Sequence, residues 1–487
     1  MALIVIGMFV LMVVSVRHDS ATFDEVEYIG AGFGCITHRA YWLSPERPPV
    51  AKSLAALSAK LIVGPHLPTE NLVWRRISRA SGGSSWSGAV SGERLGELLL
   101  YESGNDADRI VFWARAPTML LAAGFAVVLF FWTRLNFGTN TALLTTLLFA
   151  FSPTVLAHAR LATYDLCGSF AFFAGICTYL HFLRRPTWLN IVLCGIVYGG
   201  ALLMRFSTVL LGPLYVLMLF LWVATSPDHS DGLRSVAGFG IKTLMIGVVA
   251  IVLTWTVYGC LVWDFPFVWR ARAVPMTFPV DLVKTGRSFF KQELIGINMA
   301  LLARPVTRPL GEALSGLVME AQRSSMSSVS YFWGTTSTTG ARLYLPVLYL
   351  CKETLPFHLM TLMALLLGVR GRVWWFLSHR DVPLLDRLRQ SIHANFVEFS
   401  ALVFVLVYGM LALRSHLNTG IRHMLPMFPF IYLLVARQLT RQSWRIQVIT
   451  IGLAVWLVIG TINASPYFLS YYNWLGGGIS DGWKIAV

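Results

Sequence analysis

Charged residues are scarce in this chain. Asp, Glu, Lys and Arg make up 13% of its 487 residues, against 56% hydrophobic residues, and the mean hydropathy is +0.63. Soluble globular domains carry roughly 25% charged residues. The composition therefore argues against a soluble protein and indicates one that spans a membrane.

Acidic residues and patterned cysteines are also few. The chain holds 24 Asp and Glu against 39 Lys and Arg, a net charge of +15. A polytopic membrane protein carries such an excess in its cytoplasmic loops, so the charge does not call for nucleic acid as a partner. The six cysteines form no CxxC pattern and no Cys/His pair at metal spacing. We therefore expect neither a disulfide framework nor a zinc site.

Apolar runs near the length that crosses a ~30 Å hydrocarbon layer recur along the chain and predict about eleven transmembrane helices. The first run is short, but it lacks the small-residue cleavage site of a signal peptide, so we expect a true span. The runs cover residues 2–16, 117–133, 140–157, 164–182, 188–204, 206–225, 239–263, 343–368, 398–413, 423–436 and 445–463.

Basic residues in the short connections predict the orientation. With the N-terminus inside, twelve arginines fall into five inside loops, as the positive-inside rule requires. Residues 1–463 then form a transmembrane module, with two long outside loops, 17–116 and 264–342, that carry short interfacial helices. Residues 464–487 form an outside C-terminal segment. The arginines are Arg134, Arg184, Arg185, Arg234, Arg370, Arg372, Arg380, Arg387, Arg389, Arg437, Arg441 and Arg445.

Three carboxylates follow the first span directly. Asp24, Glu25 and Glu27 lie within four positions of one another. Neighbouring carboxylates at a low-dielectric boundary repel, which raises a pKa and prepares a general base or a cation site. The alternative is a solvated helix start, where acidic residues are favoured.

Two further motifs carry charge on the same predicted face. In the first, a Pro pair starts a helix and sets Arg47 and Lys52 near its entry, although such a pair is also common as simple punctuation. In the second, Arg160 and Asp165 lie in the turn between the third and fourth spans. An ionisable group at the rim of a span is expected to face a polar cavity or a partner. The alternative is an Arg160–Asp165 pair that staples the turn.

Cations collect on this face as well. Arg205 lies between two spans, Lys352 lies inside the eighth span, and Arg422 and His423 open the tenth. A phosphate group needs such donors, bidentate from Arg or as a point charge from Lys. The alternatives are that Lys352 pairs with the adjacent glutamate or extends to the interface, and that Arg422 caps a loop. Acids and phosphate-binding bases on one face together predict chemistry on a lipid-linked phosphate.

At these residues the chain resembles the protein O-mannosyltransferase and aminoarabinose transferase superfamily, GT-C-type glycosyltransferases that use polyprenyl-phosphate sugars. The resemblance covers nearly the whole chain, in six blocks that follow the family order. The blocks are FDEVEYIG (23–30), ERPPVAK (46–52), HARLATYD (158–165), and residues 331–356, 420–429 and 470–478.

The resemblance implies an all-α polytopic membrane fold with its active site on the outer face. Asp24 would be the base that accepts the proton of an acceptor hydroxyl, Glu25 would support it, and Asp165 would organise the site. The sugar would be transferred with inversion, and cations near the leaving phosphate would lower the barrier. The expected phosphate ligands are Arg205, Lys352, Arg422 and His423. The expected acceptor or structural residues are Glu27, Arg47, Lys52, Arg160, Tyr344 and Asn473.

The implied partners are a polyprenyl-phosphate-linked sugar, an acceptor and the membrane lipids, without nucleic acid. A protein acceptor is slightly favoured over a lipid or a cell-envelope glycan. No cofactor is certain, and the need for a divalent cation stays open. The implied location is a bacterial inner membrane, with the site facing the periplasm. Two readings of another class, a transporter and a noncatalytic membrane subunit, stay as alternatives, although a transporter predicts ionisable residues near the midplane of several spans.

The sequence departs from the family pattern at two positions and at its end. Arg47 stands where many relatives have His, which puts a role of that His in doubt, and Arg205 stands where many bacterial relatives have Lys, which keeps the charge. The chain stops at Val487, where bacterial relatives usually continue into a soluble segment. We therefore expect a C-terminal segment that is truncated relative to those relatives.

Overall fold

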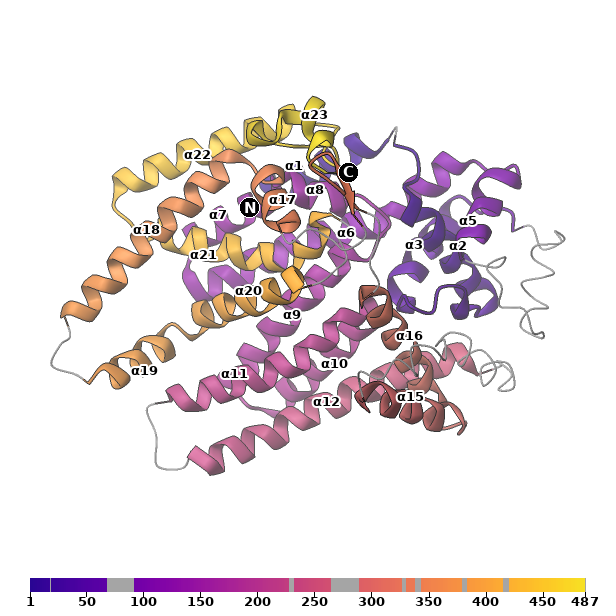
Figure 1. Cartoon of the computed structure of the whole chain (residues 1–487), viewed down its shortest axis with the longest axis horizontal. Helices are drawn as coiled ribbons and strands as arrows, with labels where there is room; N and C mark the ends of the chain where they lie inside the picture. The colour runs from indigo at the N-terminus through magenta and orange to yellow at the C-terminus, as the bar shows by residue number, and fades with distance from the viewer. Residues whose placement is uncertain are drawn as a thin grey trace.

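The computed structural model describes residues 1–17, 19–67, 92–226, 232–263, 289–325, 330–337, 343–378, 383–414 and 420–486. The helices of the main bundle lie largely side by side along the molecule (Figure 1). They are α1 (Ala2–Val16), α6 (Ala107–Phe137), α7 (Thr139–Ala150), α8 (Pro153–Ala159), α9 (Asp165–Arg184), α10 (Trp188–Met204), α11 (Leu211–Thr225), α12 (Gly232–Val262), α17 (Tyr344–Lys352), α18 (Leu355–Ser378), α20 (Phe396–Arg414), α21 (Phe428–Thr440) and α22 (Trp444–Asn463).

Shorter elements gather mainly at one end of this bundle, on the right of Figure 1, whereas α19 (Leu384–Ala394) lies at the opposite end. The helices at the first end are α2 (Phe23–His38), α3 (Pro49–Ile62), α5 (Gly92–Glu97), α15 (Phe289–Leu302) and α16 (Arg308–Ser325). Single-turn elements complete the chain: η1 (Tyr41–Leu43), the π-turn η2 (Leu98–Glu102), η3 (Phe206–Leu210), η4 (Ile421–Met427), η5 (Trp474–Gly476), α23 (Gly478–Asp481) and η6 (Gly482–Lys484).

The predicted helical membrane fold is confirmed, but the predicted number of spans is not. Within the described ranges, six helices are long and apolar enough to cross a membrane, or up to eight if each of two bent pairs is one span. The pairs are α7 with α8, bent by 63°, and α17 with α18, bent by 109°. The remaining predicted runs are shorter or divided helices: α1 and α10 have 15 and 17 residues, and the run 423–436 is divided between η4 and α21.

Two predicted boundaries also differ. Helix α6 begins at Ala107, capped by the Asp106 carboxylate, which accepts from the Arg109 N–H at 3.0 Å. The helix that carries the predicted span 117–133 therefore begins about ten residues before that span, because the charged first turns of α6 hide its start from a hydropathy pattern. Lys352 is the last residue of α17, at the 109° break, and so does not lie inside a continuous eighth span.

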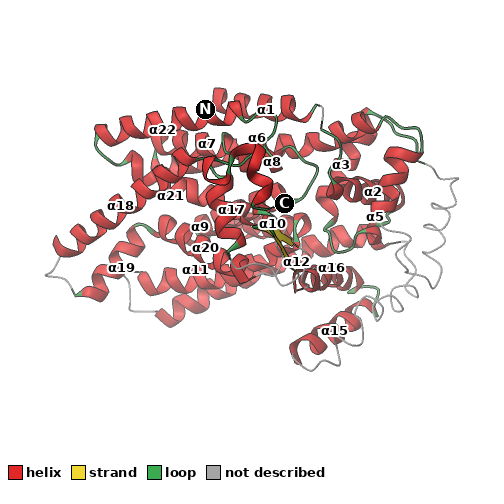
Figure 2. Cartoon of the chain, turned by 45° about the horizontal axis from the view of Figure 1, so that its top comes forward, coloured by secondary structure: helices red, strands yellow, loops and turns green. Residues whose placement is uncertain are grey.

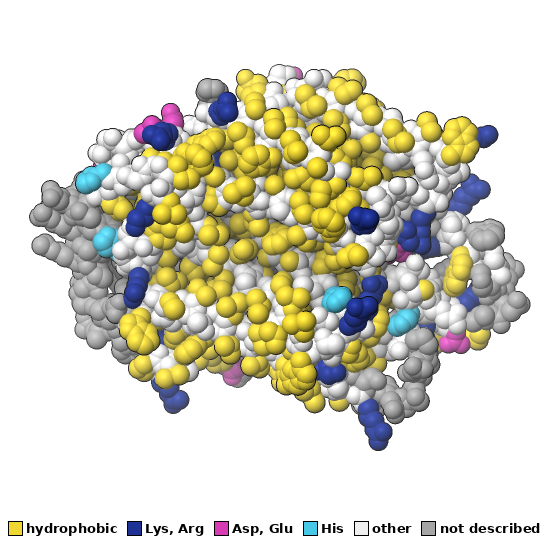
Figure 3. All heavy atoms as spheres, turned by 180° about the vertical axis from the view of Figure 1, so that it is seen from behind, with side chains coloured by type: hydrophobic (Ala, Val, Ile, Leu, Met, Phe, Trp, Pro, Cys, Tyr) yellow, Lys and Arg dark blue, Asp and Glu magenta, His cyan; other side chains and the backbone are white. Residues whose placement is uncertain are grey.

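The core of the bundle surrounds α9. In its most apolar stretch 78% of α9 is buried, against 22% for α22 and 11% for α12. Hydrophobic side chains also cover the middle of the outer surface, with Lys and Arg toward the two ends (Figure 3). This is the surface expected of a bundle surrounded by lipid. Helix α9, which carries Asp165 at its first residue, is thus the central support of the site.

Two glycines allow α2 to pack very close to its neighbours. A Cβ on Gly30 would lie 2.2 Å from the Gly92 carbonyl of α5, and one on Gly32 would lie 2.2 Å from the Lys52 carbonyl of α3. Only glycine permits such a backbone approach. The two contacts hold α2 between α5 and α3, which fixes the position of its first turn.

A small hairpin was not predicted. Strands β1 (Ser330–Phe332) and β2 (Thr335–Ser337) pair antiparallel (Figure 2). The turn residues Trp333 and Gly334 both have positive φ, as a two-residue type I′ turn requires. The Trp333 N–H donates to the Ile485 carbonyl at 2.8 Å, so the hairpin is joined to the C-terminal segment.

Candidate active site

The first turn of α2 carries the acids Asp24 and Glu25. Thr22 caps this helix in a capping box, in which the Glu25 carboxylate accepts from the Thr22 N–H at 2.9 Å. Acidic residues in a first turn also interact favourably with the helix dipole. The cap directs Glu25 back into the protein and leaves Asp24 at the helix start.

Glu25 is fully buried and engaged by protein donors. Arg115 of α6 donates to both of its oxygens at 2.7 Å, and the Ala162 N–H donates at 2.8 Å. Burial raises the pKa of Glu25, but the hydrogen bond and charge of Arg115 outweigh it, and the net pKa lies below its ordinary value. The sequence analysis expects Glu25 to support Asp24. Its contacts join α2, α6 and the turn before α9, which positions the first turn of α2.

Asp24 and Asp165 meet at one guanidinium group. Arg422 of η4 donates through Nη1 to the Asp24 carboxylate, and the same nitrogen lies 3.9 Å from an Asp165 oxygen. Arg205 donates to the other Asp165 oxygen at 3.0 Å. Four residues from distant parts of the sequence thus form a continuous chain of alternating charge.

Exposure divides this chain into an open end and a buried end. The Asp24 and Arg422 side chains are 24% and 28% exposed, whereas those of Asp165 and Arg205 are each 4% exposed. A Cβ at residue 168 would lie 2.4 Å from Arg205 Cδ, so Gly168 of α9 makes the room that Arg205 occupies. The buried pair is suited to hold the site together, and the open pair to meet a substrate.

Aromatic rings extend the site toward α3. The guanidinium carbons of Arg47 and Arg205 lie 4.7 and 4.8 Å from the centre of the Tyr164 ring. Tyr28 meets Tyr164 edge to face at 5.2 Å. Burial lowers the pKa of Arg47, but the negative charge that Tyr28 and Tyr164 can carry and two nearby glutamates raise it, and the net pKa lies above its ordinary value. Arg47 therefore stays cationic, and its Nε, like that of Arg205, is buried with no hydrogen-bond partner among the residues that the structure describes.

Glu27 and Lys52 hold the segment that delivers Arg47. The Ser44 hydroxyl donates to Glu27 at 2.6 Å, and the Lys52 ammonium donates to the Ser44 carbonyl at 2.7 Å. Burial lowers the pKa of Lys52, and neighbouring acids offset only part of that shift. Both side chains thus join α2 and α3 to the turn that precedes Arg47.

Lys352 lies close enough to the site for its charge to act on His158, together with Asp165 and Arg422. Its ammonium donates to the Leu469 carbonyl at 2.9 Å and lies 3.8 Å from the centre of the Tyr472 ring. The structure brings it to neither Asp24 nor Asp165 as an ion pair within the described ranges, and the adjacent Glu353 accepts from Ser152 at 3.1 Å instead. The bend after α17 turns the Lys352 side chain toward the C-terminal segment.

Asn473 and Tyr344 surround this bend. The Asn473 amide donates to the carbonyls of Leu350 and Glu353 at 2.6 and 2.7 Å, and its oxygen accepts from the Leu475 N–H at 2.9 Å. Tyr344 is buried at the start of α17, where its hydroxyl contacts the backbone of Gly420. Both residues hold the bent pair near η4, which carries Arg422.

Arg160 binds the segment before α2, whereas His423 lies near the charged residues of the site. Arg160 donates to the Ser15 carbonyl at 2.6 Å and pairs with Asp19 at 2.5 Å. The alternative pairing of Arg160 with Asp165 is therefore wrong. His423 follows Arg422 in η4 and interacts electrostatically with Arg205 and Asp165.

Sequence reasoning did not single out Arg115, His158 or Tyr164. His158, which is 8% exposed, interacts electrostatically with Asp165 and Arg422. A signal for Arg115 existed, because a lone arginine at the edge of an apolar run needs a buried partner. His158 and Tyr164 lie in the motif that carries Asp165, but nothing in the motif alone indicates that they face the acids.

A metal site was left open by the sequence. Over the described residues, no group of three or more His, Cys, Asp and Glu side chains is placed to hold a metal ion. The polar centre of the site consists of paired acids and guanidinium groups. This arrangement can accept a proton at an acid and bind an anion at the bases.

The chain is similar to known glycosyltransferases. Residues 109–255 match the family model of dolichyl-phosphate-mannose-protein mannosyltransferases. None of the curated proteins compared with the chain matches it. The match confirms the predicted resemblance to polyprenyl-phosphate-dependent glycosyltransferases over this part of the chain.

Solved structures give the fold. The archaeal oligosaccharyltransferase AglB from Archaeoglobus fulgidus, in complex with an inhibitory peptide and a dolichol-phosphate, aligns at a TM-score of 0.52 and 13% identity over 96% of this chain and 56% of that chain. The apo form of the oligosaccharyltransferase from the same organism aligns at a TM-score of 0.51, with the same identity and coverage. ArnT from Cupriavidus metallidurans aligns at a TM-score of 0.35 and 15% identity, over 90% of this chain and 76% of that chain. The chain spans about half the length of the archaeal enzyme, and the predicted GT-C-type fold is confirmed.

Proposed function

We propose that the chain transfers a sugar from a polyprenyl-phosphate donor to an acceptor hydroxyl. One observation carries the proposal: Arg422 lies between the carboxylates of Asp24 and Asp165, and Arg205 binds the second of them. A base and an anion-binding group are then within reach of one substrate, at the end of the bundle that carries α2 and α3, with a buried ion pair behind them. The family match over residues 109–255 supports the same reaction class.

The proposed reaction is a single displacement at the anomeric carbon. The acceptor oxygen forms a bond to that carbon as the bond to the phosphate oxygen breaks, and the leaving electron pair goes to the phosphate. The acceptor proton goes to the Asp24 carboxylate, and the anomeric configuration is inverted. Arg422 stabilises the charge that develops on the leaving phosphate, and the buried Arg205 adds positive charge behind Asp165.

Arg422 has two roles in this proposal. Without substrate its Nη1 contacts Asp24, which keeps the proton acceptor engaged. The donor phosphodiester carries one negative charge, as a carboxylate does, takes bidentate hydrogen bonds from arginine, and gains a second negative charge as the sugar leaves. Binding of the donor would therefore turn Arg422 toward the phosphate and release Asp24 to accept the proton. Asp165, buried against Arg205, keeps Arg422 in the site during this exchange.

The proposed acceptor is a protein hydroxyl. The matched family is described as acting on proteins, and the AglB structure holds an inhibitory peptide. A transporter is disfavoured because the paired charges lie at one end of the bundle, where α2 and η4 meet the start of α9, and a transport site is expected near the midplane. The proposed side is the face opposite the arginine-rich short loops, which the positive-inside rule assigns to the cytoplasm.

The test is a transfer assay with purified protein. A panel of polyprenyl-phosphate sugars is supplied with a Ser/Thr peptide, a lipid acceptor or a glycan acceptor, and the release of polyprenyl phosphate is measured together with the anomeric configuration of the product. The proposal predicts release that depends on the peptide and an inverted product. Release that depends only on the lipid or the glycan would show that the acceptor is a component of the cell envelope and not a protein. A retained configuration, or no release with any donor, would refute the proposed reaction.

A further inference from the structure

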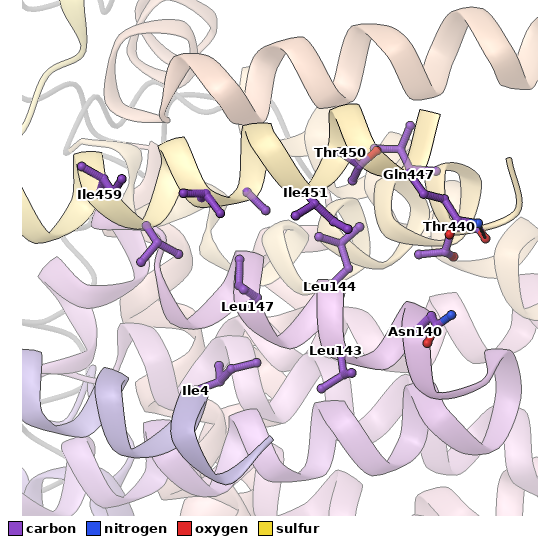
Figure 4. A pocket seen from close by; sticks show the side chains of 14 residues that line it. Ile4, Asn140, Leu143, Leu144, Leu147, Thr440, Gln447, Thr450, Ile451 and Ile459 are labelled. Carbon is purple, nitrogen blue, oxygen red and sulfur yellow. Dashed lines mark hydrogen bonds between the residues drawn. The ribbon is translucent and has the colours of Figure 1, made fainter. Parts of the chain in front are cut away.

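A long groove lies on the outer surface of the bundle, away from the acids. It has a volume of about 610 Å³ and runs between α7 and α22, with α1 at one end and the last turn of α21 at the other. We call it the α7–α22 groove; Figure 4 shows the side chains that line it. From Gln447 to Ile459 it follows about 18 Å of α22, at 1.5 Å per residue.

The lining of the α7–α22 groove changes from polar to apolar along its length. Asn140, Thr440, Gln447 and Thr450 lie together at one end, and Ile4 and Ile459 lie toward the other (Figure 4). Leucines of α7 and aliphatic residues of α22 line the space between these ends. A groove with a polar end and an apolar length matches an amphiphile with one headgroup and a hydrocarbon chain.

Positive charge surrounds the polar end. The turn from α21 to α22 carries Arg441, directly after Thr440, and α22 carries Arg445 in its first turn. Arg441 shares the Glu398 carboxylate with Arg437, at 3.5 and 2.7 Å. Arg445 is exposed and pairs with no carboxylate in the part of the chain that the structure describes. Cationic charge therefore remains in excess beside the polar end.

We propose that the α7–α22 groove binds one chain of an anionic phospholipid, whose headgroup lies at the turn between α21 and α22. The exposed Asn140 amide makes no hydrogen bond with another described residue and is available to the headgroup, while Arg441 and Arg445 supply the charge. A cation near an anionic headgroup is worth about 1 kcal/mol, a roughly fivefold preference for each arginine. The lipid would stabilise the packing of α22, which is largely exposed on the bundle surface, against α7.

The donor of the proposed sugar transfer is a different lipid for a geometric reason. Its phosphate must reach Arg422, whereas the polar end of the groove lies at the first turn of α22. The opposite end of α22, at Asn463, leads to Asn473 and the bend that lies near η4. The two ends of α22 are about 28 Å apart at 1.5 Å per residue. The inference therefore does not depend on the proposed function, and a failure of one leaves the other intact.

Lipid retention tests the proposal. Full-length protein in neutral detergent is mixed with equal amounts of phosphatidylglycerol and phosphatidylcholine with the same acyl chains, and bound lipid is counted by native mass spectrometry. We expect one phosphatidylglycerol per chain, in clear preference. The double variant Arg441→Gln/Arg445→Gln should lose most of this preference, roughly 25-fold for two arginines. The control Arg370→Gln/Arg372→Gln, which removes equal charge from exposed positions of α18, should keep it.

A second pair of variants tests the groove itself. Ala454→Phe fills the groove from a lining position and should lose the bound lipid. Val448→Phe adds a ring at an exposed position of α22 outside the lining and should retain it. Equal binding of both phospholipids, or retention of the lipid by Ala454→Phe, would overturn the proposal. Displacement of phosphatidylglycerol by added polyprenyl phosphate would assign the groove to the donor and would also overturn it.

Discussion

Arg422 Nη1 contacts the carboxylate of Asp24, a residue 398 positions earlier in the chain. The contact joins η4, near the C-terminal end of the sequence, to the first turn of α2 near its beginning, and Asp165 completes the arrangement from α9. Because Arg422 is partly exposed, the contact can open when an anion arrives. In the proposed reaction, this exchange lets one guanidinium organise the free site and then bind the leaving phosphate.

Replacement of Arg422 tests the phosphate role. Arg422→Ala should raise the donor KM roughly 10- to 150-fold, since a hydrogen bond to a charged group is worth about 1.5–3 kcal/mol. Arg422→Lys should recover part of the loss, because it keeps the charge without the bidentate geometry. Steady-state kinetics with varied donor give the values, with exposed Arg109→Ala on α6 as the control. An unchanged donor KM and kcat in Arg422→Ala would exclude this residue from phosphate binding.

Glu25 is expected to act through stability and position. Glu25→Gln leaves Arg115 buried without its charge partner, and removing one member of a buried pair costs about 3–5 kcal/mol. The thermal midpoint of the purified protein should fall strongly. Glu102→Gln is a matched control, because Glu102 also binds an arginine through two oxygens but on the surface. Equal midpoints for the two variants would show that the Glu25–Arg115 pair is not an anchor.

The same pair predicts a loss of stability in acid. The pKa of folded Glu25 lies below its ordinary value of 4.5, so the unfolded state binds more protons as the pH falls through this range. The stabilisation is complete above the unfolded pKa and is lost as the pH falls through the folded pKa. Thermal midpoints between about pH 6 and pH 3 should therefore fall more steeply for the natural protein than for Glu25→Gln. Parallel curves would contradict this assignment.

The orientation has a direct test. The arginine asymmetry predicts that a reporter fused after Val487 reads as extracytoplasmic and that one fused after Gln442, in the turn between α21 and α22, reads as cytoplasmic. Between these points lies α22, whose most apolar stretch is long enough to cross the membrane. A cytoplasmic signal after Val487 would show that the proposed side of the site is wrong.

Much of the architecture was predictable because hydropathy reports the solvent around a helix. The apolar runs are helical, and Asp24, Asp165, Arg205 and Arg422, which were chosen from separate motifs, lie in contact. Hydropathy does not report where a helix bends, so the break after Lys352 was missed, and with it the direction of that side chain.

Other features depend on contacts that a linear pattern does not contain. Glu25 and Asp24 are adjacent in sequence, yet the capping box turns one inward to Arg115 and leaves the other at the helix start. The alternative reading paired Arg160 with Asp165, its neighbour in sequence, but Arg160 pairs with Asp19 in the segment before α2. The short hairpin depends on a two-residue turn and on a hydrogen bond to the C-terminal segment. Its own few residues contain no pattern that predicts strands.

The central claim is that Asp24 accepts the proton of the acceptor. The most direct measurement is the rate of polyprenyl phosphate release in a single turnover by Asp24→Asn, with donor binding measured on the same sample and Asp108→Asn, an exposed residue of α6, as the control. We predict a rate lower by roughly 10²–10⁴-fold, the usual contribution of a general base, with donor affinity kept within a few fold. A rate for Asp24→Asn equal to that of the natural protein would contradict the account.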